Sequence, residues 1–545
     1  MKKKGMILFF VLLLLCGCAN QNIEVTEPKT VTETVETISE VSPKSGGTLY
    51  LSMRTTQTLN PLTNEDATVD RILKLVYAPL ITFDEDLKPA PSIAESWTYS
   101  EDGRTLSISL KQDIYWSDGT NVTAEDVIFS MNAIRASSEN SVYKKCMQNV
   151  VGFSRDGNYR VTVTFNRPFS GNIYSMCFPV ICAHYYGKDN IVTSTKNLEP
   201  MGNGPFQFKS FTPAKELRLV KSENSFGKVP YIDEICVIIS PDESTDLYSF
   251  DQGLTDSVSA NITEMGKYDA TKKTKRFEYT TNYYDFIGFN FNRSMLQDKN
   301  VRKAIAYCIP KENILESVYL NHAEDAATPV NPNSWLYEDD VQKYHYDLSH
   351  AKVLLEESGW ADSDNDKIRD RNINEFFETL KVSILVNEEN EERRQIAVRL
   401  ADEMKTIGFD VSIDVEPFEI YTQKLQERDY DIFVGGWQFS VVPDYSFMFH
   451  SNEASDGTNY ASYKNEQMDQ LLNATYAAVQ EEDVKTAYSN FQKYAAEEIP
   501  YISLVFRNSA LFTNKRIYGE IQPLENNIYN NVNEWFIEEA ENNNK

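Results

Sequence analysis

The stretch that decides the fold is Asp429-Tyr430-Asp431-Ile432-Phe433-Val434-Gly435-Gly436-Trp437, in which an apolar run ends at a glycine pair. A short apolar run bounded by glycine predicts a buried strand over 431–434. Before this stretch, the spacing of apolar residues predicts helices that alternate with strands. The helices are expected over 351–358, 391–407 and 421–427, and the strands over 380–386 and 411–415. Strands that alternate with helices indicate an α/β architecture.

Further toward the N-terminus, strands and hairpins are expected to dominate. A short strand is predicted over 46–52, after a glycine turn. A hairpin is predicted over 97–110, because an Asp-Gly turn separates two runs of alternating polarity. Thr123 and Asp126 form the Asp variant of a capping box, which predicts the start of a helix. Another helix is predicted over 70–77 from its apolar face.

The first residues predict export from the cytoplasm. The apolar run Met6–Leu15 follows a lysine-rich head and predicts a signal peptide over 1–17. The run is too short for a membrane-spanning helix, which needs about 20 residues. It ends in Leu15-Cys16-Gly17-Cys18, which resembles the lipobox of bacterial lipoproteins. That resemblance implies a lipid on Cys18 and anchoring to the outer face of the bacterial cytoplasmic membrane. A plain signal peptide and a buried strand are the alternatives.

The segment 18–45 is predicted to be a flexible tether. It is rich in Thr, Glu and Val and holds no aromatic residue, so it buries too little apolar surface to fold alone. An edge strand is the alternative interpretation. The body that follows, about 500 residues, is too long for one core and predicts two or three domains.

Composition excludes some classes of function. The formal net charge of −28 repels nucleic acid, so no nucleic-acid partner is expected. Neither a His-Glu-x-x-His nor a Gly-x-Ser-x-Gly motif is present, which argues against the corresponding hydrolases. The body holds an odd number of cysteines, and sequence does not set any pairing: Cys146, Cys177, Cys182, Cys236 and Cys308. Buried free thiols are the simple expectation for most of them.

One acidic segment resembles part of a calcium loop. Asp362-Ser363-Asp364-Asn365-Asp366 and Asp370 place carboxylates at alternate positions, as hard cations prefer. Lys367 replaces the turn glycine, and Ile373 stands where the bidentate Glu belongs. A solvated acidic loop is therefore predicted, and no metal site is expected.

Short motifs are spread over the whole body, at Val76–Leu80, Leu87–Trp97, Asp102–Arg104, Trp116–Thr120, Thr123–Val127, Gly202–Phe206, Asn290 with Val301–Ala304, Ala351–Trp360, Asp429–Trp437 and Ile499–Tyr501. In this order they resemble the motifs of bacterial family 5 solute-binding proteins, the oligopeptide, dipeptide and nickel receptors of ABC importers. Each motif is weak alone, but their shared order is hard to reach by chance.

The resemblance implies a three-lobed α/β fold of the periplasmic-binding-protein type (type II, peptide-binding class) with hinge closure around a ligand cleft. Lobe I would combine 46–75, 200–282 and 500–545, lobe II would be 76–199, and lobe III 283–499. Such receptors deliver a ligand to an ABC permease in the membrane and perform no chemistry. No enzymatic activity and no cofactor are therefore expected, and the protein is expected to be a monomer.

In peptide-binding relatives the ligand backbone pairs with a strand that ends in Gly-Trp, which is Val434–Gln438 here. The glycines would let another backbone approach, and aromatic walls would flank it. The alternative for Trp437 is a position in the core, where it would cap the strand. The resemblance thus places these residues in the ligand site: Phe418, Gly435, Gly436, Trp437 and Gln438.

The sequence departs from oligopeptide-binding relatives three residues after Trp437. There the relatives carry an Asp that pairs with the peptide's amino terminus, and this chain has Ser440. The next carboxylate is Asp444, which either supplies the charge or acts as a turn or helix-capping residue. If neither residue binds an amine, the ligand has no free amine at this place.

Capture of peptides, oligopeptides or dipeptides, is the leading hypothesis for function. Within the same fold, receptors for a nickel chelate, an oligosaccharide or a signalling peptide are the alternatives. A cell-surface hydrolase and a structural adhesin are alternatives from other classes.

Overall fold

The computed structural model describes residues 42–139, 141–224, 227–269, 273–373 and 376–538. The predicted signal peptide, Cys18 and the tether up to residue 41 lie outside the described residues. The residues from Pro43 onward belong to one unit. In the described part of the chain, no helix has the length and apolar character needed to cross a membrane.

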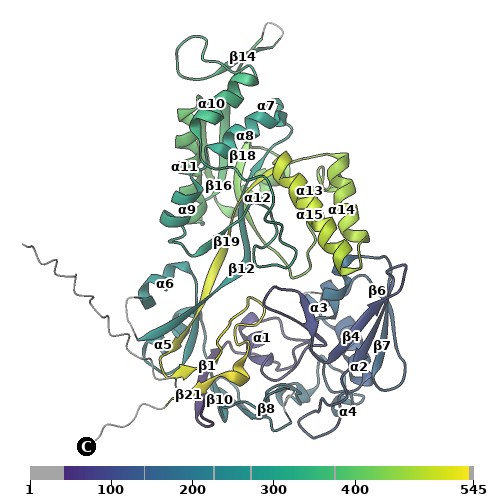
Figure 1. The fold of residues 1–545 in the computed structure, drawn as a ribbon. Coiled ribbons are helices and arrows are strands. Elements are labelled where there is room, and N and C mark those ends of the chain that lie inside the picture. Colours follow the sequence, from purple (N-terminus) through teal and green to yellow (C-terminus); the bar gives the residue numbers. More distant parts are fainter. Residues whose placement is uncertain (1–41, 140, 225–226, 270–272, 374–375, 539–545) are drawn as a thin grey trace, which may run out of the picture. The chain divides into compact units, whose positions relative to one another are not determined.

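The first sheet joins the start of the body to a later segment. Its four strands lie in the order β1-β10-β9-β8, with β1 parallel to β10 and the other pairs antiparallel (Figure 1). The bounds are β1 (Thr48–Met53), β10 (Glu234–Ile239), β9 (Glu216–Lys221) and β8 (Phe206–Thr212). The strand predicted over 46–52 is therefore confirmed.

The helix predicted over 70–77 begins and ends earlier, as α1 (Ala67–Leu73). Asp66 caps it by accepting hydrogen bonds from the amides of Thr68 and Val69. Beyond the helix, the carbonyl of Val76 accepts hydrogen bonds from the amides of Asn203 and Gly204. A Cβ on Gly204 would lie 2.7 Å from the carbonyl carbon of Val76, so the Gly-Asn-Gly loop approaches the chain where the helix was expected to continue.

A second four-stranded sheet is antiparallel throughout. Its order is β4-β5-β7-β6, with bounds β4 (Ala94–Tyr99), β5 (Thr105–Leu110), β7 (Arg160–Phe165) and β6 (Val150–Arg155). The predicted hairpin is β4–β5. Helix α2 (Ala124–Ala136) begins at the predicted capping box, where the amide of Thr123 donates to Asp126 at 2.8 Å.

The third sheet has seven strands and carries the α/β alternation of the second half. Its order is β11-β19-β12-β18-β16-β17, and β13 pairs with β19 (Figure 1). The bounds are β11 (Ser257–Ala260), β19 (Tyr501–Asn514), β12 (Thr274–Phe289), β18 (Ile432–Gln438), β16 (Lys381–Asn387), β17 (Asp410–Glu416) and β13 (Ala323–Asp325). Helices α11 (Glu391–Thr406) and α12 (Phe418–Glu427) connect its parallel strands, which confirms the predicted alternation.

Other elements in the described residues are shorter or lie outside these sheets. Helix α10 (Leu348–Glu357) packs on α8 (Lys299–Tyr307). Further helices are α3 (Val142–Cys146), α4 (Ala183–Tyr186), α5 (Glu243–Asp251), α6 (Ile262–Asp269), α7 (Ser294–Gln297), α9 (Lys311–Ser317), α13 (Ser446–Phe449), α14 (Glu466–Ala477) and α15 (Glu481–Glu498). Two-stranded pairs are β2 (Ile81–Phe83) with β3 (Pro89–Pro91), β14 (Asp370–Ile373) with β15 (Phe376–Thr379), and β20 (Ile517–Tyr518) with β21 (Phe536–Ile537).

The long strand β12 runs past the predicted lobe boundary at 282/283, whereas β19 begins at Tyr501, just after the predicted boundary at 499/500. Their register is interrupted between Thr280 and Tyr284, which leaves a bulge at residues 281–283. The division into three lobes stays a prediction.

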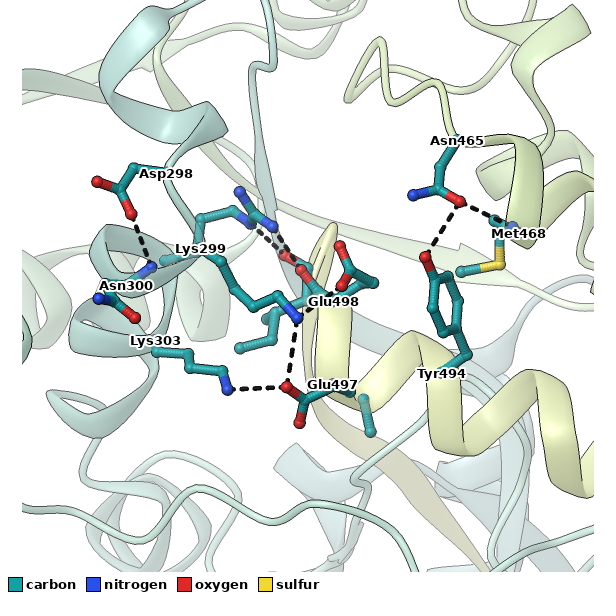
Figure 2. A network of polar contacts seen from close by, with 12 residues as sticks. Asp298, Lys299, Asn300, Lys303, Asn465, Met468, Tyr494, Glu497 and Glu498 are labelled. Carbon is teal, nitrogen blue, oxygen red and sulfur yellow. Dashed lines mark hydrogen bonds and ion pairs between the residues drawn. The ribbon is translucent and has the colours of Figure 1, made fainter. Parts of the chain in front are cut away.

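A polar network fixes the point where β19 begins (Figure 2). Lys299 contacts Glu497 and Glu498, and Lys303 contacts Glu497 at 3.0 Å, so α8 is tied to the end of α15. Beside them the buried Arg302 donates to four main-chain carbonyls, those of Leu296, Gln297, Glu498 and Ile499. Two of the sequence motifs, Val301–Ala304 and Ile499–Tyr501, therefore meet here in a structural role.

Candidate ligand-binding site

A cavity of about 350 Å³ lies where the chain segments near α1 meet the residues around 77–83 and 174–179. This volume falls within the usual range for ligand sites, about 300–1,000 Å³. Most of its wall is apolar or aromatic, and its main lining residues are Leu73, Tyr77, Ile81, Phe83, Tyr143, Cys146, Tyr174, Cys177, Val441, Asn526 and Asn527. We call it the main cavity.

A smaller cavity of about 50 Å³ adjoins it, and we call this the annex. The two share Phe83, Tyr174, Val441 and Asn526 as wall. The annex also touches Asn282, Asn331, Ser334, Phe439, Ser440, Tyr445 and Glu525. Asn282 comes from the bulge of β12, and its carbonyl accepts a hydrogen bond from the amide of Phe439. The irregular strand thus positions main-chain groups at the annex.

The charges of the main cavity are largely paired within the chain. Lys74 lies 2.6 Å from Asp70 and donates to the carbonyl of Asn526. The Tyr143 hydroxyl donates to Asp70 at 3.4 Å, and burial, followed by this carboxylate, raises the pKa of Tyr143. Burial also raises the pKa of Cys146 and of Cys177, so both remain uncharged thiols in the wall.

Of the residues predicted to bind ligand, Ser440 lines the annex. Gly435, Gly436, Trp437 and Gln438 lie on β18, which leads toward Ser440. Strand β16 pairs with β18 only at Ile432 and Phe433, so among the described residues no strand pairs with β18 from Gly435 onward on that side. An extended ligand backbone could add there, as the sequence analysis anticipated.

The two glycines make room for side chains of the chain itself. A Cβ on Gly436 would lie 2.0 Å from the guanidinium of Arg393 and 2.6 Å from the carboxylate of Asp285. A Cβ on Gly435 would lie 2.9 Å from the ring of Phe433. The absence of a side chain at these positions is therefore explained by internal packing.

The aromatic residues of the predicted site differ in burial. Trp437 stacks on Tyr460, with ring centroids 5.9 Å apart, and meets Phe447 edge-on. It is partly buried in a cluster, which fits the alternative of a packed tryptophan as well as a wall. Phe418 is 58% exposed at the start of α12 and stacks on Tyr421.

Asp444 has partners within the chain for both carboxylate oxygens. One oxygen accepts from the amide of Ser446 at 2.9 Å, and the other accepts from the hydroxyl of Tyr476. These contacts match the turn and capping alternative. Asp444 does not line either cavity, and its role in ligand binding stays a prediction.

Several residues at the cavities had no signal in the sequence. Tyr174, Asn282 and the pair Glu525–Asn526 come from three separate segments that the fold brings together. No local motif marks them: Tyr174 lies in a short 3-10 helix, Asn282 in the bulge of β12, and Glu525 and Asn526 in a loop.

Two groups of side chains could be considered for a metal. Asp126, Cys182 and His184 have ligand atoms within 4.8 Å of one another, but Asp126 already accepts from the amides of Thr123 and Ala183. His184 contacts Asp118 at 2.8 Å. These contacts join α2 to α4, and a structural role accounts for them. Asp362, Asp364 and Asp366 are exposed, as a solvated acidic loop would be.

Comparison with known proteins agrees with this geometry. A family model described as bacterial extracellular solute-binding proteins, family 5 Middle, matches residues 88–459. The oligopeptide-binding protein AppA of Bacillus subtilis is 26% identical over 510 residues, which cover 91% of this chain and 92% of AppA. Other relatives are named for binding dipeptides, nickel and heme.

Solved structures show the same fold. An ABC transporter substrate-binding protein from Sinorhizobium meliloti matches with a TM-score of 0.77 at 20% identity, over 90% of this chain and 100% of that one. Bacillus subtilis AppA in complex with a nonapeptide matches with a TM-score of 0.60 at 24% identity, over 91% and 100% of the two chains. The chain belongs to the family 5 bacterial extracellular solute-binding proteins, the non-catalytic receptors that work with ABC transporters outside the cytoplasm.

Proposed function

We propose that this receptor captures peptides and delivers them to the membrane permease of an ABC importer. The observation that carries the proposal is one side of β18, where no strand in the described part of the chain pairs with Gly435–Gln438. The next residues, Phe439 and Ser440, line the annex. Main-chain groups on such an edge bind another backbone without reading its side chains. A nickel chelate or a heme offers no main chain to pair with this edge.

The walls of the two cavities support the same proposal. Apolar and aromatic residues make up more than half of the wall of the main cavity, and its polar residues include Asp70, Lys74 and Asn526. Such a wall accommodates varied side chains, while the polar groups orient the ligand. Bacillus subtilis AppA, which resembles this chain over nearly its whole length, is known with a bound nonapeptide.

The proposal includes anchoring through Cys18. A lipid there would hold the receptor at the outer face of the cytoplasmic membrane, where a permease accepts the ligand. The segment 18–45 would then act as the tether between lipid and body.

Mass spectrometry of small molecules released from natively purified, then denatured protein tests the ligand class. Peptides in amounts comparable to the protein are expected. Release of heme, a nickel chelate or an oligosaccharide in their place would overturn the peptide proposal and leave the family membership unchanged.

A second measurement tests enclosure. Small-angle scattering with a peptide identified in this way should show a smaller radius of gyration than the apo protein. At about 100 times Kd, the ligand should stabilise the fold by about 2.7 kcal/mol. An unchanged radius at saturating peptide would contradict hinge closure.

A further inference from the structure

The annex contains one carboxylate, that of Glu525. The other polar residues in its wall are Asn282, Asn331, Ser334, Ser440, Tyr174, Tyr445 and Asn526, which carry no charge. Glu525 is half-buried, and the nearby main chain of Asn282 acts to lower its pKa. A negative group thus faces a small cavity whose remaining wall is neutral.

The nearest basic groups do not neutralise this carboxylate directly. Arg71 and Lys74 act on Glu525 electrostatically, and Lys74 is itself paired with Asp70 at 2.6 Å. Burial outweighs both, so the pKa of Glu525 is raised above its ordinary value. A cation placed in the annex would lower the free energy of the charged form.

The two residues that follow Glu525 give an independent observation. The side-chain oxygens of Asn526 and Asn527 are buried, and neither accepts a hydrogen bond from any residue in the described part of the chain. Asn526 lines both cavities, and Asn527 lines the main cavity. A buried acceptor without a donor costs about 1–3 kcal/mol, so a ligand that brings donors is favoured here.

An ammonium group matches these requirements. It carries a positive charge and three N–H donors, which suit one carboxylate and neighbouring carbonyl oxygens. A space of about 50 Å³ admits a group of this size, because a water molecule occupies about 30 Å³. A carboxylate or phosphate group in the annex would be repelled by Glu525.

We propose that Glu525, with Asn526 beside it, binds a protonated amine of the ligand, and that the receptor selects ligands with a free ammonium group. The inference rests on the proposed peptide function. It assigns to Glu525 the charge that Ser440, which also lines the annex, lacks. The amine comes from the amino terminus of a peptide or from a lysine side chain, and the experiment separates these sources.

The test uses a pool of alanine-based peptides of two to six residues, each present with a free and with an N-acetylated amino terminus. Ligand-stripped full-length protein is incubated with the pool, and retained peptides are quantified by mass spectrometry. We expect the free forms to be retained about 100-fold more strongly. Equal retention of both forms would overturn the inference while peptide binding stands. Retention of neither form would contradict the peptide function itself.

Glu525→Gln then removes the charge with little change of shape, and Asp444→Asn removes the alternative carboxylate for comparison. Calorimetry with the best retained free peptide should show a loss of about 100-fold for Glu525→Gln, and little further loss when that peptide is acetylated. Asp444→Asn should bind like wild type. The reverse pattern would assign the amine to Asp444 and overturn the inference.

If Glu525→Gln has a lowered melting temperature, Asn526→Ala provides a second variant. Its affinity for peptides with a free amino terminus should fall about 10-fold, and its affinity for acetylated peptides should not change. Acetylated peptides that contain lysine report the source of the amine. Their recovery of tight binding to wild type, but not to Glu525→Gln, would identify a side-chain amine as the bound group.

Discussion

The guanidinium of Arg507 donates to the fully buried carboxylate of Asp285 at 2.5 Å, across the pair of strands β12 and β19. Arg393, from α11, contacts the other oxygen of the same carboxylate at 2.9 Å. The hydroxyl of Tyr319 donates to it as well. The buried carboxylate of Asp285 thus joins β12 to β19, to α11 and to the segment that carries Tyr319, close to Gly436.

Removal of this charge should destabilise the fold strongly. In Asp285→Asn, Arg393 loses its carboxylate partner and Arg507 keeps only the more distant Glu392, at 3.7 Å. Breaking a buried ion pair costs about 3–5 kcal/mol. Urea unfolding should show a loss of that size. Asp362→Asn, at an exposed carboxylate, is the control and should change stability little. A loss below about 1 kcal/mol for Asp285→Asn would contradict the assigned role.

The same group should make stability depend on acid. Burial by itself would raise the pKa of Asp285, but Arg507 and Arg393 outweigh it and hold that pKa below its ordinary value. The contribution is therefore complete above the unfolded pKa of about 3.9 and is lost as the pH falls through the lower folded pKa. Unfolding followed from pH 6 to pH 2 should show a steeper loss for wild type than for Asp285→Asn. Parallel curves would argue against this titration.

Gly436→Ala should also destabilise the protein, because the added Cβ overlaps Arg393 and Asp285. Overpacking of this kind costs about 1–3 kcal/mol. Gly266→Ala, in α6, is the control and should stabilise the protein slightly. Nothing lies within 4 Å of the added atom, and alanine favours a helix more than glycine does. Thermal unfolding of both variants compares the two effects. Equal melting temperatures for both variants would count against the steric argument.

Asp444→Asn should lower the melting temperature, because it removes the charge and one of the two acceptor oxygens of this residue. The amide of Ser446 and the hydroxyl of Tyr476 both donate to the carboxylate. Burial, with Asp444 as the next cause, raises the pKa of Tyr476 to about 12, so this hydroxyl is a donor at neutral pH. A loss of about 1–3 kcal/mol is expected, as for hydrogen bonds to charged groups. An unchanged melting temperature would show that Asp444 has no stabilising role as a turn or capping residue.

Cys18→Ala should abolish lipid attachment. Metabolic labelling with a fatty acid, followed by fractionation, should place wild type with membranes and the variant in the medium or periplasm. Cys16→Ala is the control, because only Cys18 follows the Leu-Cys-Gly sequence, and it should keep the label. Full labelling of Cys18→Ala would show that the lipobox prediction is wrong.

Local patterns predicted much of the fold. The helix expected over 391–407 is α11, and the capping box at Thr123 starts α2. Both depend on interactions between residues close in sequence. The full length of β12 could not be predicted from local patterns, because only its end, over 286–289, is continuously apolar. Its remaining residues are held by β19, which lies more than 200 residues away.

The candidate site was less accessible to prediction. The resemblance pointed to β18, and Ser440 does line the annex. The glycines of that strand accommodate Arg393 and Phe433, which no short motif encodes. Glu525 lies 85 positions after Ser440 in the sequence, so only the folded chain shows that they share one cavity.

The wall of the two cavities includes Glu525, Asn526 and Asn527, near the end of the chain, together with residues from α1 near its beginning. A chain emerging from a ribosome or a translocation channel lacks this wall until residues 525–527 have passed. Ligand capture therefore begins only after these residues have been made and exported. A truncated polypeptide, even one that folds its first two sheets, would not compete with the finished receptor for ligand.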